Sequence, residues 1–294
     1  MERILVLGAN GFIGSYLMRA LALSFPGIAL EGMSYSQIDL SDKHSISMLI
    51  PRLGKETTVV LCAAIKRQFG DNLDAYEKNV AMCLSLARAI EIASIGHLLF
   101  FSSMAVYGED IHNLAIDEDT KICPRSYYGL AKCTGEKIFE KVIGPQRGIF
   151  TALRPPLIYG PGDEGNTYGP AGFLKKAMTA ETIVLWGDGR ELREFIFVED
   201  AVRVVTKILQ DRCEGVLNLS SGRSYSFVDV LDILKEILPQ GVKIESRART
   251  KDRVDNACCN VKIKQWMGEM RFTSLGEGIR KTYEQELAIS RLGF

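Results

Sequence analysis

Short runs of apolar residues alternate along the first half of the chain with longer stretches in which apolar residues recur every three or four positions. The short runs predict buried strands, at residues 3–7, 28–32, 58–62, 97–102 and 149–153. The periodic stretches predict helices, at residues 11–24, 43–53, 74–94 and 126–142. Strands that alternate with helices in this way are typical of an α/β fold built on a parallel, doubly wound sheet. We expect such a domain over residues 1–154.

The pattern becomes mixed in the second half of the chain. Turn sequences at Pro155-Pro156, Gly160-Pro161-Gly162 and Gly187-Asp188-Gly189 interrupt it. Helices are predicted between and after these turns, at residues 171–179, 199–210 and 226–238. We therefore expect a smaller region of mixed structure over residues 155–294, with segments near 184–198 returning to the first domain.

A glycine-rich turn joins the first strand to the first helix. Gly8, Gly11 and Gly14 directly follow the apolar run that ends at Leu7. In this position Gly8 allows a tight turn, Gly11 lets the backbone approach a pyrophosphate, and Gly14 lets the helix pack close to the strand. The helix N-terminus then offers free N–H groups to phosphate. The spacing is G-x-x-G-x-x-G rather than G-x-G-x-x-G, but its place between strand and helix predicts a dinucleotide site.

A tyrosine and a lysine stand one helical turn apart in Tyr128-Gly-Leu-Ala-Lys132, and Ser103 precedes them by twenty-five residues. Because side chains at i and i+4 share a helix face, the Lys132 ammonium can favour the tyrosinate and lower the pKa of Tyr128 below its usual ~10. A tyrosine in this state can exchange a proton with the hydroxyl of a sugar or alcohol. The alternative is an ordinary tyrosine and a solvated lysine on an amphipathic helix.

The charges of the chain cancel, with 36 Lys and Arg residues against 36 Asp and Glu residues, so electrostatics gives no reason to expect a nucleic-acid partner. No apolar run approaches the ~20 residues of a membrane helix, and the glycine turn begins too early for a signal peptide to precede it. Neither the histidines His44, His97 and His112 nor the seven cysteines are spaced as a metal site. We expect a cytoplasmic protein whose cysteines are thiols, with no metal.

Further motifs follow one another along nearly the whole chain. They are GANGFIG (8–14), Asp39-Leu40, Leu61-Cys62-Ala63-Ala64, Asn79, SSMAVYG (102–108), YGLAK (128–132), LRPPLIYGPG (153–162) and GDGRELREFIFVEDAV (187–202). In order and spacing they resemble the extended short-chain dehydrogenase/reductase family, which includes NAD-dependent nucleotide-sugar epimerases and dehydratases. The resemblance implies a Rossmann domain that binds NAD or NADP, followed by a substrate-binding region.

The resemblance assigns the cofactor contacts to residues of the first domain and its end. These are Gly8, Asn10, Gly11, Phe12, Ile13, Gly14, Asp39, Leu40, Ala63, Ala64, Asn79, Tyr128, Lys132 and Pro155. An acid near the end of the second strand would select NAD, but Ser34 occupies that position, Glu31 falls inside the strand, and no arginine stands nearby for a 2′-phosphate. NADP is therefore slightly favoured, and NAD stays open. Asp39 does not separate the two, and its alternative role is a helix cap with Ser41.

The resemblance also implies the chemistry. Tyr128 would be the acid–base residue, Ser103 would hydrogen-bond the reacting oxygen, and Lys132 would hold the nicotinamide ribose. Hydride would pass between a sugar carbon and the nicotinamide. The 4,6-dehydratases of the family carry an Asp-Glu pair where this chain has Met104-Ala105, so elimination of water has no evident acid and base here. What remains is reversible oxidation at one carbinol.

Substrate binding is expected from the second part of the chain. Arg193 matches the family's diphosphate-binding arginine, and a forked guanidinium suits that anion. Asn166 and Arg253 are further candidates, although Arg253 lies in a charged stretch typical of a surface. Leu157 stands where the epimerases often have an asparagine, so one diphosphate contact is missing or is replaced by Asn166. The pair Lys66-Arg67 either lies near the sugar or faces solvent.

Together with these residues, the resemblance implies an NAD(P)-dependent oxidoreductase acting at C4 of a nucleoside-diphosphate sugar. Two outcomes stay open: a 4-epimerase, whose cofactor remains bound between half-reactions, and a 4-keto reductase, whose cofactor leaves after one transfer. Two other classes are a dehydratase and a protein that binds a dinucleotide to sense redox state without turnover. Apolar residues on more than one face of the helices at 74–94 and 126–142 predict a homodimer, or else ordinary core packing.

Overall fold

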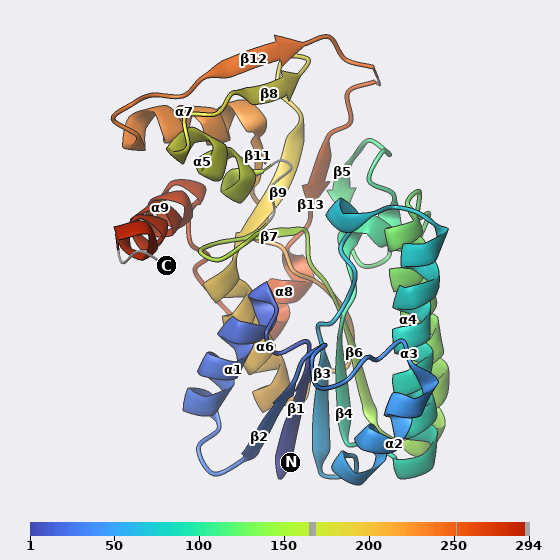
Figure 1. Cartoon of the computed structure of the whole chain (residues 1–294). Coiled ribbons are helices and arrows are strands. Elements are labelled where there is room, and N and C mark those ends of the chain that lie inside the picture. The colour runs from blue at the N-terminus through green and yellow to red at the C-terminus, as the bar shows by residue number, and fades with distance from the viewer. Residues whose placement is uncertain (165–168, 251, 292–294) are drawn as a thin grey trace.

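The computed structural model describes residues 1–164, 169–250 and 252–291. Its larger part is a parallel sheet with helices on both faces, and its smaller part lies beyond the carboxyl ends of the strands (Figure 1). The sheet consists of β1 (Arg3–Leu7), β2 (Ala29–Met33), β3 (Thr57–Leu61), β4 (His97–Phe101), β6 (Ile149–Arg154) and β10 (Gly215–Asn218). Its order is β10-β6-β4-β3-β1-β2, and every pair is parallel. The order reverses between β1 and β3, and sheets of this kind bind ligands at that point.

Helices bury both faces of the sheet. One face packs against α1 (Phe12–Ser24), α6 (Val198–Asp211) and α8 (Val261–Met267). The other packs against α2 (Ile46–Leu49), α3 (Leu73–Ala93) and α4 (Tyr127–Ile143). Strands that are buried on both sides need apolar residues at successive positions, which explains the continuous apolar runs in the sequence.

This arrangement confirms the predicted α/β class with a doubly wound parallel sheet. The predicted helix at 43–53 is wrong as a continuous element, because 3-10 turns at Lys43–Ser45 and Ile50–Arg52 flank the short α2. Pro51 lies in this segment and has no N–H to donate to an α-helical ladder. The sequence pattern also misses β10, since a strand of four residues is too short to display a period.

The smaller part contains short sheets and its own helices. The strands pair in the orders β11 (Ser224–Ser226)-β9 (Leu192–Phe197)-β7 (Leu157–Tyr159), β12 (Ile244–Arg247)-β8 (Ile183–Trp186) and β13 (Asn256–Cys258)-β5 (Asn113–Ile116). The helices are α5 (Pro170–Met178), α7 (Phe227–Ile237) and α9 (Leu275–Arg291). The strands near residues 184–198, β8 and β9, pair in the short sheets of the smaller part. The segments that return to the larger part come directly after them, as α6 and β10.

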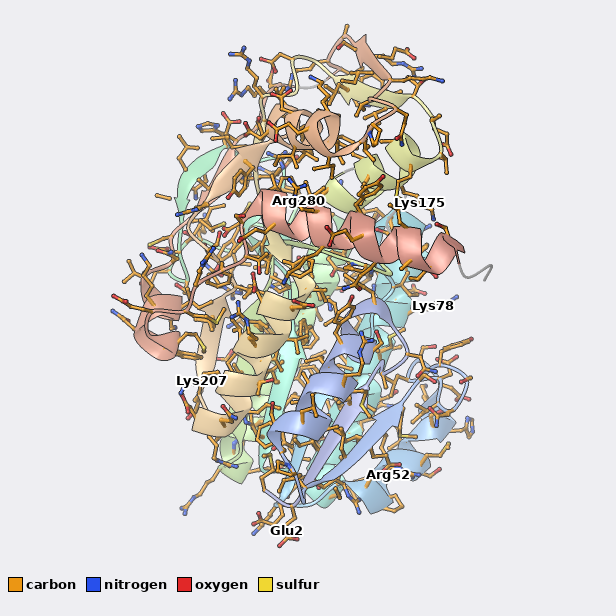
Figure 2. The ribbon with its side chains drawn as sticks, turned by 90° about the vertical axis from the view of Figure 1, so that its left-hand side faces the viewer. Glu2, Arg52, Lys78, Lys175, Lys207 and Arg280 are labelled. Carbon is orange, nitrogen blue, oxygen red and sulfur yellow. The ribbon has the colours of Figure 1, made fainter. Side chains whose placement is uncertain are left out.

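Exposed charged side chains occur on both parts of the molecule. Glu2 lies at the base of the large sheet, whereas Lys175 on α5 and Arg280 on α9 lie on the smaller part (Figure 2). Over the described ranges, no helix combines the length and the apolar character needed to cross a bilayer. All seven cysteines are free thiols.

Candidate active site

The glycine turn is built so tightly that two of its positions accept only glycine. Gly8 follows β1 with φ +97°, and a Cβ on it would lie 2.7 Å from the nitrogen of Ala63, just after β3. A Cβ on Gly14 would overlap the Gly8 carbonyl oxygen, so α1 starts close against β1. Gly11 is the N-cap of α1 and has no side chain that could cap the helix. The N–H groups of the first turn are therefore available to a ligand. The turn therefore fits a dinucleotide pyrophosphate at the point where the strand order reverses.

Several other predicted cofactor residues surround this turn. Asn10 Nδ2 donates to Ser34 Oγ at 3.2 Å and so joins the turn to the end of β2. Phe12 and Ile13 line a cavity above the sheet. Ala63 N donates to the carbonyl of Leu7 at 2.9 Å, and Ala64 follows directly. The turn, the end of β2 and the end of β3 are thus brought together.

Two predicted cofactor residues already bind protein groups. Asp39 Oδ1 accepts hydrogen bonds from Ser41 N at 2.9 Å and from Ser41 Oγ at 2.6 Å. These bonds close a local turn, and the cap of the following 3-10 turn is Asp42 instead of Asp39. The amide of Asn79 bonds both the N–H and the carbonyl of Ile65, at 2.8 and 3.0 Å. Asn79 therefore fixes the chain after β3. Leu40, which was also predicted to contact the cofactor, is buried.

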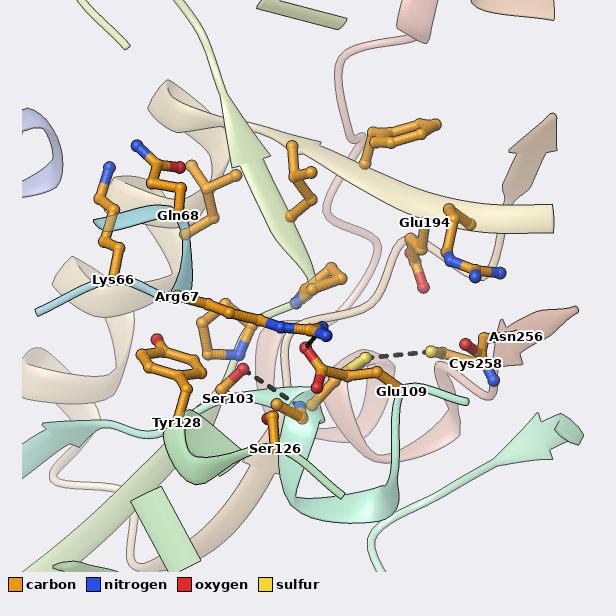
Figure 3. Close-up of a pocket in the computed structure, with 18 of the residues that line it drawn as sticks. Lys66, Arg67, Gln68, Ser103, Glu109, Ser126, Tyr128, Glu194, Asn256 and Cys258 are labelled. Carbon is orange, nitrogen blue, oxygen red and sulfur yellow. Dashed lines mark hydrogen bonds and ion pairs between the residues drawn. The ribbon is translucent and has the colours of Figure 1, made fainter. Parts of the chain in front are cut away.

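A cavity of about 850 Å³ opens between the large sheet and the smaller part, and Ser103 and Tyr128 line it (Figure 3). Ser103 follows β4 and begins a 3-10 turn, where its Oγ accepts a hydrogen bond from Ala105 N at 3.1 Å. Tyr128 lies in the first turn of α4, whose N-cap Ser126 accepts from Gly129 N at 3.0 Å. Two residues far apart in sequence thus share one wall of the cavity.

The electrostatics of Tyr128 differ from the expectation. Its pKa is raised to about 12, chiefly by burial and then by the Glu109 carboxylate, against a hydrogen bond with Ser103 that lowers it. A lowered pKa was expected from Lys132. However, Lys132 Nζ lies 5.6 Å from the centre of the Tyr128 ring and donates to the Phe101 carbonyl at 2.6 Å. The phenol is therefore protonated at neutral pH.

Lys132 is a buried ammonium behind this wall, only 5% exposed. Burial lowers its pKa to about 8, although the nearby Cys83, Cys62 and Glu136 act in the opposite direction. At neutral pH Lys132 keeps its charge, and its proton is held less firmly than that of an exposed lysine.

A buried ion pair holds the wall in place. Arg154 Nη2 lies 2.6 Å from Glu136 Oε2, and its Nε donates to Glu136 Oε1 at 2.9 Å. Arg154 Nη1 also donates to Tyr107 Oη at 2.6 Å, and that hydroxyl donates to Asn218 Oδ1 at 2.9 Å. The network joins α4, β6, β10 and the turn after β4, and thereby fixes the elements that carry Ser103 and Tyr128.

Of the predicted substrate residues, Arg193 lines the cavity. Its Nη1 donates to the carbonyls of Leu192 and Val254. Pro155, which was predicted to contact the cofactor, lines the cavity as well, and its carbonyl accepts a hydrogen bond from Met104 N at 3.0 Å. Leu157, where the epimerases often have an asparagine, also lines the cavity.

Arg253 is not among the residues that line the cavity. Its Nε lies 3.1 Å from Asp255 Oδ1, and its side chain is 43% exposed, in agreement with the charged stretch around it. Asn166 lies outside the described residues.

The sequence left open the place of Lys66 and Arg67, and both line the cavity. Lys66 Nζ lies 3.5 Å from Asp163 Oδ1. Arg67 Nη1 lies 2.8 Å from Glu109 Oε1, and in Figure 3 its side chain reaches across the cavity to that carboxylate. Sequence reasoning missed Glu109, because a single acid in a loop carries no motif.

Glu194 and Cys258 were also missed. Glu194 is buried, and its carboxylate accepts a hydrogen bond from Ser220 Oγ at 2.9 Å; burial raises its pKa. Cys258 Sγ lies 3.1 Å from Met104 Sδ, and burial raises the pKa of the thiol. Both line the cavity. Glu194 lies inside the motif at 187–202, but the sequence does not show which side chains of that motif face the cavity, and Cys258 lies outside every motif.

A family model described as the NAD dependent epimerase/dehydratase family matches residues 4–220 of the chain. The chain belongs to this family. The matched range runs from the glycine turn through Ser103, Tyr128 and Arg193 to the end of the large sheet. Membership confirms the resemblance seen in the sequence.

Relatives within this family carry out more than one reaction. The chain is 26% identical to the UDP-glucose 4-epimerase of Lactobacillus helveticus, over 80% of this chain and 81% of that one. It is 27% identical to the dTDP-4-dehydro-6-deoxy-D-allose reductase of Streptomyces bikiniensis, over 82% of this chain and 83% of that one.

Among solved structures, MoeE5 in complex with UDP-glucuronic acid and NAD superimposes with a TM-score of 0.84 and 25% identity. The superposition covers 98% of this chain and 99% of that one. The likeness confirms the fold of the chain, with its Rossmann sheet in the larger part. It also supports NAD as the cofactor. It gives no support to a preference for NADP.

Proposed function

We propose that the protein oxidises and reduces C4 of the hexose in a nucleoside-diphosphate sugar, with NAD as its cofactor. The observation that carries the proposal is a single cavity of about 850 Å³ that is lined by Ser103, Tyr128, Phe12 and Arg193. It joins the glycine turn to an acid–base pair and to a diphosphate-binding candidate, and its size is typical of ligand sites. Relatives named for chemistry at C4 support the choice of carbon.

The residues divide the work of one carbinol–ketone interconversion. NAD, when bound, supplies the acceptor or donor of hydride. Ser103 Oγ orients O4 of the sugar, and Tyr128 Oη exchanges the O4 proton. In the reduction the protonated phenol gives its proton to O4 while C4 gains hydride. In the oxidation the tyrosinate takes that proton while C4 loses hydride, and the Lys132 ammonium offers positive charge near the ring.

We propose NAD rather than NADP, against the slight preference drawn from the sequence. The side chains that contact Ser34 Oγ in the described part of the chain are neutral, namely Asn10, Ser36 and Gln37. A 2′-phosphate calls for a cation at this position, whereas ribose hydroxyls need only neutral or acidic partners.

A 4-epimerase is the favoured form of the reaction, because a UDP-glucose 4-epimerase is among the relatives. This form requires that the cofactor stay bound between the two half-reactions. A 4-keto reductase is the second candidate, favoured by the reductase relative. To separate them, freshly purified protein is denatured and any released dinucleotide is identified by chromatography and mass. Stoichiometric NAD supports the epimerase. Protein without retained nucleotide that binds a reduced dinucleotide on addition supports the reductase.

The two remaining classes make different predictions in the same assay. A redox sensor would bind dinucleotide and leave every nucleotide sugar unchanged. A dehydratase would release water and yield a deoxy-keto sugar. Met104-Ala105 stands where the 4,6-dehydratases carry an Asp-Glu pair, so these two positions offer no carboxylate for that elimination. Mass analysis identifies a dehydrated product. Because an epimer has the same mass as its substrate, chromatography that resolves the C4 epimers separates the epimerase from a redox sensor.

We also propose that the protein is a homodimer formed through α3 and α4. Leu73, Leu84, Tyr127 and Leu130 on these helices are exposed. The rings of Tyr76 and Tyr127 pack against each other in a tilted arrangement across the two helices, with ring centres 6.3 Å apart, so the exposed side chains of α3 and α4 belong to one surface. An apolar surface of this kind is typical of an interface between subunits.

A further inference from the structure

The cavity contains a carboxylate that the proposed reaction does not use. Glu109 follows the turn after β4, and its Oε1 lies 2.8 Å from Arg67 Nη1. The other oxygen, Oε2, is buried and has no hydrogen-bond partner among the residues that the structure describes. A buried carboxylate oxygen without a donor is costly, so a donor that arrives with a ligand would stabilise it.

Glu109 lies beside the reacting groups. It shares the cavity with Ser103 and Tyr128, and its charge is felt at Tyr128, whose pKa it raises. Figure 3 draws Glu109 next to Ser103, with Arg67 crossing from the loop after β3 to meet it. A carboxylate has about four sites for accepting hydrogen bonds, so Glu109 can keep its pair with Arg67 and still accept a donor from a sugar.

Arg67 is itself shared between two carboxylates. Its Nε lies 3.6 Å from Asp71 Oδ2, in addition to its contact with Glu109. Asp71 is held in turn, because its Oδ1 accepts a hydrogen bond from Tyr128 N at 3.0 Å at the start of α4. Two acids and one cation leave this corner of the cavity with a net negative charge, which favours hydrogen-bond donors and repels anions.

The other cations on this side of the cavity also have acidic neighbours. Lys66 Nζ lies 3.5 Å from Asp163 Oδ1, and Arg125 Nε lies 3.8 Å from Asp110 Oδ1. A carboxylate on the sugar would therefore compete with these acids instead of meeting an unmatched cation, and juxtaposed like charges disfavour binding.

We propose that Glu109 is a specificity-determining residue that accepts a hydrogen bond from a hydroxyl or amide N–H of the hexose, and that the Arg67–Glu109 pair restricts the substrate to nucleoside diphosphates of uncharged hexoses. The inference rests on the proposed function, since it sets the sugar against the wall of Ser103 and Tyr128. It adds the class of sugar, which the reaction alone leaves open.

The experiment measures binding by calorimetry in a Tyr128→Phe background saturated with NAD, so that no probe is turned over. UDP, dTDP and GDP are tested first, and the glucose and glucuronic acid adducts of the nucleotide that binds are then compared. The parent background is expected to bind the glucose adduct at least about tenfold more tightly than the glucuronic acid adduct.

Glu109→Gln keeps the shape of the side chain and removes its charge. It is expected to weaken binding of the glucose adduct about tenfold, because a charged hydrogen bond is lost. The ratio of the affinities for the glucose and glucuronic acid adducts should therefore fall. Binding of the free nucleoside diphosphate is expected to stay unchanged. Asp119→Asn is the control, because it removes the same charge from an exposed acid ten residues away that does not line the cavity, and it should keep the full preference.

Arg67→Gln provides a second variant, in case Glu109→Gln fails to fold. It leaves two unmatched acids and should widen the preference against the glucuronic acid adduct. An unchanged preference in the variants, or a parent protein that prefers the glucuronic acid adduct, would overturn the inference. A parent protein that binds none of the three nucleoside diphosphates would instead overturn the proposed function, on which the inference depends.

Discussion

At the scale of single residues, burial sets the chemical character of the reacting groups. Tyr128 loses solvation on the cavity wall, which raises its pKa to about 12, and Lys132 loses solvation behind it, which lowers its pKa to about 8. A neutral phenol beside a charged ammonium suits proton donation to O4, and oxidation then requires the phenol to lose its proton. Both half-reactions therefore depend on how the site controls one proton.

Tyr128→Phe removes the group that exchanges the O4 proton. Turnover of the nucleotide sugar is expected to fall about 10²–10⁴-fold, while NAD affinity changes little, since the glycine turn is untouched. Steady-state rates and NAD titration of the variant check this. Turnover within a factor of two of the wild type would exclude Tyr128 as the acid–base residue.

The oxidation half-reaction is expected to accelerate with pH. With a pKa of about 12 for Tyr128, the fraction of tyrosinate rises about tenfold per unit between about pH 6 and about pH 8. Lys132 keeps its charge up to its pKa of about 8. Single-turnover formation of reduced nicotinamide, followed against pH, measures the effect. A flat profile in this range would mean that deprotonation of Tyr128 does not limit oxidation.

Lys132→Met should raise the stability of the folded protein and lower its affinity for NAD. The unfolded chain binds the lysine proton up to its ordinary pKa, and the folded chain releases it near 8, so the charge costs stability below pH 8 and the cost disappears as pH rises toward the ordinary pKa. Allowing for the donor lost at the Phe101 carbonyl, the expected gain at neutral pH is about 2 kcal/mol.

Thermal denaturation without added dinucleotide tests this, with NAD affinity measured in parallel. The gain in Tm should be largest below pH 8 and should shrink at higher pH. A variant that is less stable than the wild type at neutral pH would mean that the ammonium is better accommodated than its burial indicates.

At the scale of elements, the contact between α1 and β1 decides whether the cofactor turn can form. A methyl group on Gly14 would meet backbone atoms of Gly8 and Ala9, which cannot move aside as a flexible side chain could. The packing of this helix on this strand is therefore part of the binding site as well as of the fold.

Gly14→Ala is expected to destabilise the protein by at least about 2 kcal/mol, since overpacking forces the backbone to shift, and to weaken NAD binding. Gly144→Ala, at the end of α4 with open space around the added methyl, is the control. It should leave both properties unchanged or raise stability slightly. Denaturant titration and NAD binding compare the two. Equal stability of both variants would contradict the tight packing of α1 on β1.

The sequence predicts these elements well where the signal is local. The turn residues Gly8 and Gly14 and the buried strands are each specified by a few neighbouring positions. The segment at 43–53 was predicted less well, because Pro51 and tertiary packing break the helix that its period favours. The pair of Arg67 and Glu109 could not be foreseen, since forty-two residues separate them and only the topology brings their loops together.

At the scale of the whole molecule, the cavity lies between two parts that contribute different functions. The larger part carries the glycine turn, Ser103 and Tyr128, and the smaller part adds Arg193 and Cys258. Neither part encloses the cavity alone, which explains why a long second half with a mixed pattern accompanies a recognisable dinucleotide fold.

The exposed apolar side chains on α3 and α4 predict a dimer of twice the 32.6 kDa chain at micromolar concentration. Leu130→Glu, on the outer face of α4, should shift the protein to monomers by placing a charge in the interface. Light scattering measures both species. A wild-type protein that remains monomeric at this concentration would mean that these residues are only the outer edge of the core.

The central claim is that Ser103 and Tyr128 support hydride transfer between NAD and a nucleotide sugar. The most direct test mixes NAD-saturated protein with nucleoside-diphosphate hexoses in a stopped-flow instrument and records the absorbance of reduced nicotinamide. We predict a transient rise in the wild type with a sugar that binds, and no rise in Tyr128→Phe at the same occupancy. The claim would be contradicted if a bound sugar produced no reduced nicotinamide in the wild type. It would also be contradicted if the wild type and Tyr128→Phe gave equal signals.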